Sequence, residues 1–96
     1  MGGCVAMYYA ADKQKAQRVL TELRTARTGE ASATRACLHR IRNEVACETT
    51  TDLPRLQAWA ALRKLYDAYR AAPERDLKPL WQDAITKIQV WGESLR

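Results

Sequence analysis

The stretch LKPLWQDAITKIQVWGESL, residues 77–95, decides the fold class of this chain. Its large apolar side chains recur every three or four residues, and nearly all positions between them are polar. That spacing is the period of an α-helix with one buried face. The residues predicted to line this face are Leu77, Leu80, Trp81, Ala84, Ile85, Ile88, Trp91 and Leu95. Asp76 and Pro79 suit the opening of this helix, as a capping carboxylate and a first-turn proline.

The preceding segment opens in the same way and predicts a second helix, from Asp52-Leu53-Pro54 to a stop at Pro73. Asp52 is the expected N-cap, and Pro54 is tolerated in a first turn because its missing N–H has no partner there. The apolar arc of this helix is broad, which predicts contact with more than one neighbour. Its members are Ala58, Trp59, Ala61, Leu62, Leu65, Tyr66 and Tyr69.

The first half of the chain predicts two more helices. Over residues 13–27 an apolar face forms after an expected N-cap at Asp12, and Thr28-Gly29 ends the helix. That face consists of Ala16, Val19, Leu20, Leu23 and Ala26. A shorter helix is expected after an N-cap at Ser32, and it fades at residues 48–51. Its stripe consists of Cys37, Leu38, Ile41 and Val45.

These patterns predict an all-α fold, a small antiparallel bundle of three or four helices. Short connections favour antiparallel neighbours, so the last two helices are expected to form a hairpin with the first two packed across it. The 96 residues, 47% hydrophobic and 28% charged, are typical of one globular domain. We expect an N-terminal leader over residues 1–11 and a single helical domain over residues 12–96.

The side chains needed for catalysis or metal binding are scarce. His39 is the single histidine, and Cys4, Cys37 and Cys47 do not have the spacing of zinc ligands. His39 is predicted to point to solvent, away from the apolar stripe of its helix, and no nucleophile or carboxylate is placed to orient it. The sequence therefore predicts a protein that is not an enzyme, with no cofactor and no metal.

A basic stripe is predicted on the helix that contains His39. The chain carries a net charge of +5, and Arg35 and Arg42 lie seven residues apart, two helical turns, on the exposed side. Arginines so placed can bind phosphates or an acidic protein surface. Nucleic-acid binding through this stripe is an alternative function, and a solvated face without a partner is the competing interpretation.

The main prediction is a non-enzymatic protein–protein interaction module, acting as a small subunit, adaptor or inhibitor. Aromatic residues and arginine are enriched at protein interfaces, and this chain has three tryptophans, of which Trp59 and Trp91 are candidates for partial exposure. The expected partner is a larger protein or complex, with a second copy of the chain as an alternative. The predicted partner-binding residues are Trp59, Arg63, Tyr66, Tyr69 and Arg70, with Arg35 and Arg42 as a second patch.

The amino terminus suggests a third function. Met1-Gly2-Gly3-Cys4 resembles the start of N-myristoylated proteins, in which Gly2 is acylated and a nearby cysteine is palmitoylated, although Ala6 replaces the preferred Ser or Thr. Lipidation at Gly2 and Cys4 would make the chain a peripheral membrane protein. If the chain is not lipidated, its odd number of cysteines and the absence of a signal peptide predict an intracellular location, in the cytoplasm or inside an organelle.

Overall fold

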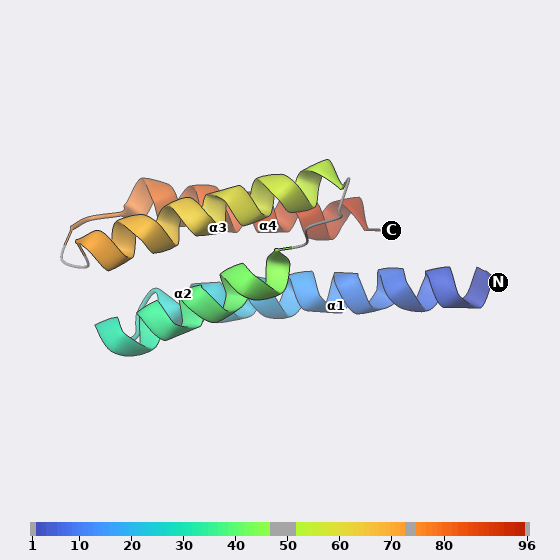
Figure 1. Ribbon diagram of the computed structural model, residues 1–96, viewed down its shortest axis with the longest axis horizontal. Coiled ribbons are helices and arrows are strands. Elements are labelled where there is room, and N and C mark those ends of the chain that lie inside the picture. The colour runs from blue at the N-terminus through green and yellow to red at the C-terminus, as the bar shows by residue number, and fades with distance from the viewer. Residues whose placement is uncertain (1, 47–51, 73–74, 96) are drawn as a thin grey trace.

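The computed structural model describes the backbone of residues 2–46, 52–72 and 75–95, and side chains from residue 12 onward within these ranges. Four helices occupy the described residues: α1 (Gly2–Ala26), α2 (Ala31–Val45), α3 (Leu53–Ala71) and α4 (Lys78–Ser94). Figure 1 shows that successive helices run in opposite directions, with α1 and α2 forming one hairpin and α3 and α4 the other. The predicted all-α antiparallel bundle is confirmed, and it has four helices.

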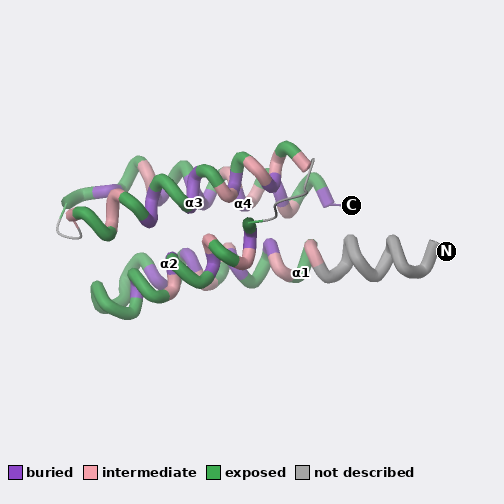
Figure 2. Tube along the Cα trace, in the orientation of Figure 1, coloured by how far each residue is buried: buried purple, intermediate pink, exposed green. Residues whose placement is uncertain are grey.

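Each helix packs along two others, so the four helices form a ring around a shared core. The pairs whose backbones lie side by side are α1–α2, α2–α3, α3–α4 and α1–α4. Buried positions recur along every helix (Figure 2), as expected when each helix turns one apolar stripe inward. The broad apolar arc of α3 faces both α2 and α4, which confirms the prediction of more than one neighbour.

The predicted apolar stripes lie in the core almost residue for residue. On α4 the whole stripe is buried except Leu80, and on α1 only Leu20 is partly exposed. On α2 the buried positions include Thr34 in place of the expected Cys37, because the Thr34 hydroxyl donates a 2.7 Å hydrogen bond to the carbonyl of Ala26. That bond closes the turn between α1 and α2 and satisfies a carbonyl at the end of α1.

Two predicted helix starts are wrong. Asp12 does not cap a helix, because α1 begins at Gly2 and Asp12 lies inside it. Residues 4–11 contain no proline and end in two alanines, so nothing there interrupts a helix. Ser32 does not cap α2 either, because the Thr34 N–H bonds to the carbonyl of Glu30 at 2.8 Å and makes Glu30 the N-cap residue.

The predicted starts of α3 and α4 agree more closely with the structure. Asp52 is the N-cap of α3, and its carboxylate accepts a hydrogen bond from the Arg55 N–H at 3.5 Å. Leu77, not Asp76, is the N-cap residue of α4, but the Asp76 carboxylate still accepts the Lys78 N–H at 3.0 Å. Proline lies in the first turn of both helices, as predicted.

Candidate interaction surface

The two flanks of α2 have different neighbours. Its buried stripe, which includes Leu38 and Ile41, faces the core. On one flank Arg40 and Glu44 reach across to α1. On the other flank His39 and Arg42 contact Tyr66 of α3. Arg35 lies one turn before His39 on this second flank, so the predicted basic stripe of α2 borders α3.

Tyr66 lies at the centre of the boundary between α2 and α3. The His39 ring lies 5.4 Å from the Tyr66 ring, centroid to centroid, at an angle of 47°. The Arg42 guanidinium carbon lies 5.0 Å from the centroid of the same ring, within reach of a cation–π contact. Tyr66 is only 9% exposed, so these contacts make it part of the intramolecular packing instead of an accessible docking residue.

A second row of predicted partner-binding residues runs along α3. Trp59, Arg63, Tyr66 and Arg70 are spaced by four, three and four residues, which places them on one side of a helix. Trp59 is half-buried, and the Arg63 guanidinium carbon lies 5.7 Å from its ring. Since Tyr66 contacts α2, this row follows the same boundary as the α2 stripe. Tyr69 lies elsewhere, with its ring packed edge-on against Trp81 of α4 at 6.3 Å.

The fold therefore brings the two predicted patches together. We call this surface the basic face and define it as Arg35, His39, Arg42, Trp59, Arg63 and Arg70. Together α2 and α3 contain seven basic side chains and two acidic ones, whereas α4 contains two of each. Within the described part of the chain, none of the four arginines of the basic face forms an ion pair.

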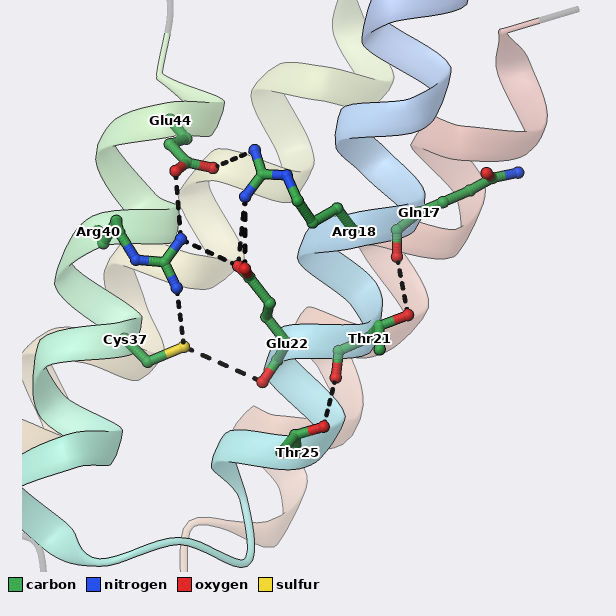
Figure 3. Close-up of polar contacts among 8 residues, drawn as sticks. All are labelled: Gln17, Arg18, Thr21, Glu22, Thr25, Cys37, Arg40 and Glu44. Carbon is green, nitrogen blue, oxygen red and sulfur yellow. Dashed lines mark hydrogen bonds and ion pairs between the residues drawn. The ribbon is translucent and has the colours of Figure 1, made fainter.

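The opposite flank of α2 carries a network of four charged side chains (Figure 3). Arg18 and Glu22 of α1 alternate in sign with Arg40 and Glu44 of α2. The shortest link joins Arg18 Nη2 to Glu44 Oε2 at 2.7 Å, and Arg40 Nη1 lies 3.1 Å from Glu22 Oε2 and 3.2 Å from Glu44 Oε1. Every charge thus faces opposite charges on both helices, which stabilises the register of α1 against α2.

The network shifts the pKa values of its members. The hydrogen bond from Arg18, helped by the charges of Arg18 and Arg40, lowers the pKa of the Glu44 carboxyl below its ordinary value, although burial opposes this. Hydrogen bonds to Glu44 and Glu22 raise the pKa of Arg18 and Arg40, respectively. The neighbouring Cys37 is half-buried, and burial raises the pKa of its thiol, against the opposing effect of Arg40. A protonated thiol is a poor nucleophile, so we expect Cys37 to act as a packing residue and not as a reactive thiol.

This network predicts a pH dependence of stability. Because the pKa of Glu44 is depressed in the folded state, its contribution is present above the unfolded value of about 4.3 and is lost as the pH falls through the folded pKa. We expect the free energy of unfolding in urea to decrease as the pH is lowered from about 5 to about 3. Roughly 1 kcal/mol of this decrease should be absent in Glu44→Gln. Glu93→Gln is the matched control, because Glu93 is exposed and has no ion pair among the described residues. An equal effect of both substitutions would contradict the assignment to Glu44.

One buried charged side chain was not predicted. Arg55 is 6% exposed, and its Nη1 lies 3.7 Å from Asp12 Oδ2 of α1. Its Nε and Nη2 donate to the carbonyls of Val45 and Glu44 at 2.8 and 3.4 Å, and its guanidinium carbon lies 5.4 Å from the Trp91 ring. The only local signal is an arginine next to apolar positions in DLPRL, residues 52–56, which also fits a solvated residue.

The remaining predicted sites have simpler outcomes. His39 is exposed, as predicted, and Trp91 is fully buried, so its predicted partial exposure is wrong. No group of three or more His, Cys, Asp or Glu side chains placed to hold a metal occurs among the described residues. The side chain of Cys4 and the whole of Cys47 lie outside the described residues, and Gly2 is described only as the first backbone position of α1.

Two further observations bear on function. Among residues 2–46, 52–72 and 75–95, no helix has both the length and the apolar character required to cross a bilayer. A search of protein-family models, curated proteins and solved structures found no match to this chain. Functional inference therefore depends on the geometry and charge of the surfaces described above.

Proposed function

We propose that this chain is a non-enzymatic interaction module whose basic face docks on an acidic surface of a larger protein or complex. It would act there as a small subunit, an adaptor or an inhibitor. One observation carries the proposal: four arginines border the same helix–helix boundary, and no described carboxylate pairs with them. A partner carboxylate would supply the missing opposite charge, and arginine binds carboxylates through two parallel hydrogen bonds.

The aromatic contacts within the basic face support this proposal. Arg42 lies over Tyr66, and Arg63 lies over Trp59. These contacts restrict the rotamers of the Arg42 and Arg63 side chains before a partner binds, which lowers the entropy lost on binding. Trp59 is half-buried and exposed enough to contact a partner, and tryptophan beside arginine is a common composition of binding hot spots.

Charge reversal of the α2 stripe tests the proposal. The double variant Arg35→Glu/Arg42→Glu should weaken partner binding by about 100-fold or more. Arg35 is exposed and Arg42 is partly buried over Tyr66, so circular dichroism of the variant checks that the fold is kept. The matched control is Lys13→Glu/Arg24→Glu on α1, which makes the same change in net charge at exposed positions. Binding is measured by affinity capture from the native cell with nuclease treatment, followed by titration of the purified partner.

The capture experiment also separates the alternatives. A partner that survives nuclease, is lost in the α2 double variant and is retained in the control supports the proposal. Nucleic-acid binding through Arg35 and Arg42 predicts loss of all partners on nuclease treatment and an affinity that falls steeply with salt. An intact mass increased by an acyl chain at Gly2 or Cys4 would favour the lipid-anchored alternative. Equal binding by both double variants would exclude the basic face as the docking site.

A further inference from the structure

A polar cavity of about 240 Å³ lies at one end of the bundle. Figure 1 shows that α1 and α3 end here and that α4 begins here. The cavity is lined by cations from three separate segments: Arg27 follows α1, Arg75 precedes α4 in the connection from α3, and Lys78 opens α4. Tyr69 and Trp81 add aromatic surface to the lining.

The charges of the described residues around this cavity are unbalanced. Among these residues, Asp76 is the one carboxylate in the lining, against three cations. The Asp76 carboxylate is already engaged, since its Oδ1 accepts the Lys78 N–H at 3.0 Å. None of the three cations forms an ion pair with any residue that the structure describes. Like charges that share a cavity repel one another, so an anion that enters gains from all three at once.

The aromatic side chains give the cavity one rigid wall. Trp81 is 6% exposed, and the Tyr69 ring packs edge-on against it at 6.3 Å and 87°. The Tyr69 hydroxyl is in addition a neutral donor of a kind that commonly binds phosphate oxygens. Because a packed core residue holds this wall, the cations are the part of the site that can adjust around a ligand.

We propose that this cavity binds a small multivalent oxyanion, either phosphate or pyrophosphate, or the phosphoryl group of an ester. Arginine and lysine side chains are the usual ligands for such groups, as bidentate and point-charge donors respectively. The volume lies below the range of about 300–1,000 Å³ typical for drug-sized ligands, so the site suits the phosphoryl group and not a whole nucleotide.

Titration of the ¹⁵N-labelled full chain with pyrophosphate tests the proposal, with the Trp81 indole N–H as a local probe. We expect saturable shifts of this signal in the wild-type protein. Arg27→Gln and Arg75→Gln should each weaken the affinity roughly threefold or more. Asp76→Asn should act in the opposite direction and strengthen it roughly threefold, because the amide oxygen can still accept the Lys78 N–H while the negative charge is removed.

Arg35→Gln is the matched control, because it removes one positive charge from the basic face and none from the cavity. Equal weakening by Arg35→Gln and Arg27→Gln would overturn the proposal in favour of non-specific charge attraction, and so would shifts that do not saturate at millimolar pyrophosphate. Parallel titrations with inorganic phosphate, serine and O-phosphoserine identify the form of the phosphoryl ligand. Tighter binding of O-phosphoserine than of either phosphate or serine supports an esterified group. Tighter binding of inorganic phosphate than of O-phosphoserine supports a free ion. All substituted side chains are exposed, so unchanged far-UV circular dichroism is expected throughout.

Discussion

Replacement of Arg55 by alanine is expected to destabilise the protein by about 3–5 kcal/mol, measured as the free energy of unfolding in urea. Small domains are stable by only about 5–15 kcal/mol, so this single change would remove a large part of the total. The expected size follows from the position of the guanidinium, which joins all four helices while it is nearly excluded from water.

Three separate groups lose a partner when Arg55 is truncated. The Asp12 carboxylate, whose side chain is 14% exposed, would keep its charge without the nearby cation. The carbonyls of Glu44 and Val45, at the end of α2, would lose their donor, and carbonyls in a last helical turn have no partner within the helix. Unpaired groups of this kind are more expensive than the loss of a contact alone, because each has given up its hydration.

Matched variants separate these contributions. Arg63→Ala on the same helix removes an exposed arginine and should change stability by less than about 1 kcal/mol. Arg55→Lys keeps the charge but not the planar set of donors, so its free energy of unfolding should lie between those of Arg55→Ala and the wild type. If the Asp12 ion pair contributes, the double variant Asp12→Ala/Arg55→Ala should be less destabilised than the sum of the single variants. Similar losses for Arg55→Ala and Arg63→Ala would contradict the central role of Arg55.

The second large effect is expected at Trp91, where truncation to alanine should remove about 3–5 kcal/mol of stability. Trp91 has no exposed surface and is the largest fully buried side chain. Its loss would leave a cavity beside the last turn of α4 and would remove the ring over which Arg55 lies. The measurement is again urea unfolding, followed by circular dichroism so that the removed tryptophan does not affect the signal.

Trp59→Ala is the control for Trp91, because it removes the same side chain from a half-buried position. We expect it to reduce stability by less than half as much. Trp91→Phe should be milder than Trp91→Ala, since it keeps most of the ring volume and also removes the Nε1–H, which is buried without a hydrogen-bond partner among the described residues. Equal effects of Trp59→Ala and Trp91→Ala would show that burial does not determine the energetic role of these rings.

The candidate surface illustrates how much the sequence could predict. The helical period alone puts Arg35 and Arg42 on one side of α2, and Arg63 and Arg70 on one side of α3, because each pair is seven residues apart. The sequence offered no means of knowing that these two sides adjoin. It also placed Tyr66 among the docking residues, whereas the fold covers its ring with His39 and Arg42. Exposure at the edge of an apolar arc depends on which neighbouring helix lies there.

The charged network and Arg55 show the same limit more strongly. Arg18 with Glu22 and Arg40 with Glu44 are each recognisable as helical pairs four residues apart. Their combination into one network requires α1 and α2 to pack at a particular register, and the 2.7 Å contact joins residues 26 positions apart. Arg55 depends on contacts with three other helices, none of them local.

By itself, then, the sequence determined the four helices, their buried stripes and the cap of α3, because these follow from hydrogen bonds and side-chain spacing within a few residues. Tertiary structure alone decided which flank of each helix meets which neighbour, and hence the burial of Arg55, the α1–α2 charge network, the basic face and the cationic cavity. The physical reason is that helical periodicity specifies a direction around one axis. Contacts between helices depend on the relative position of two axes, which is set by packing of the whole core.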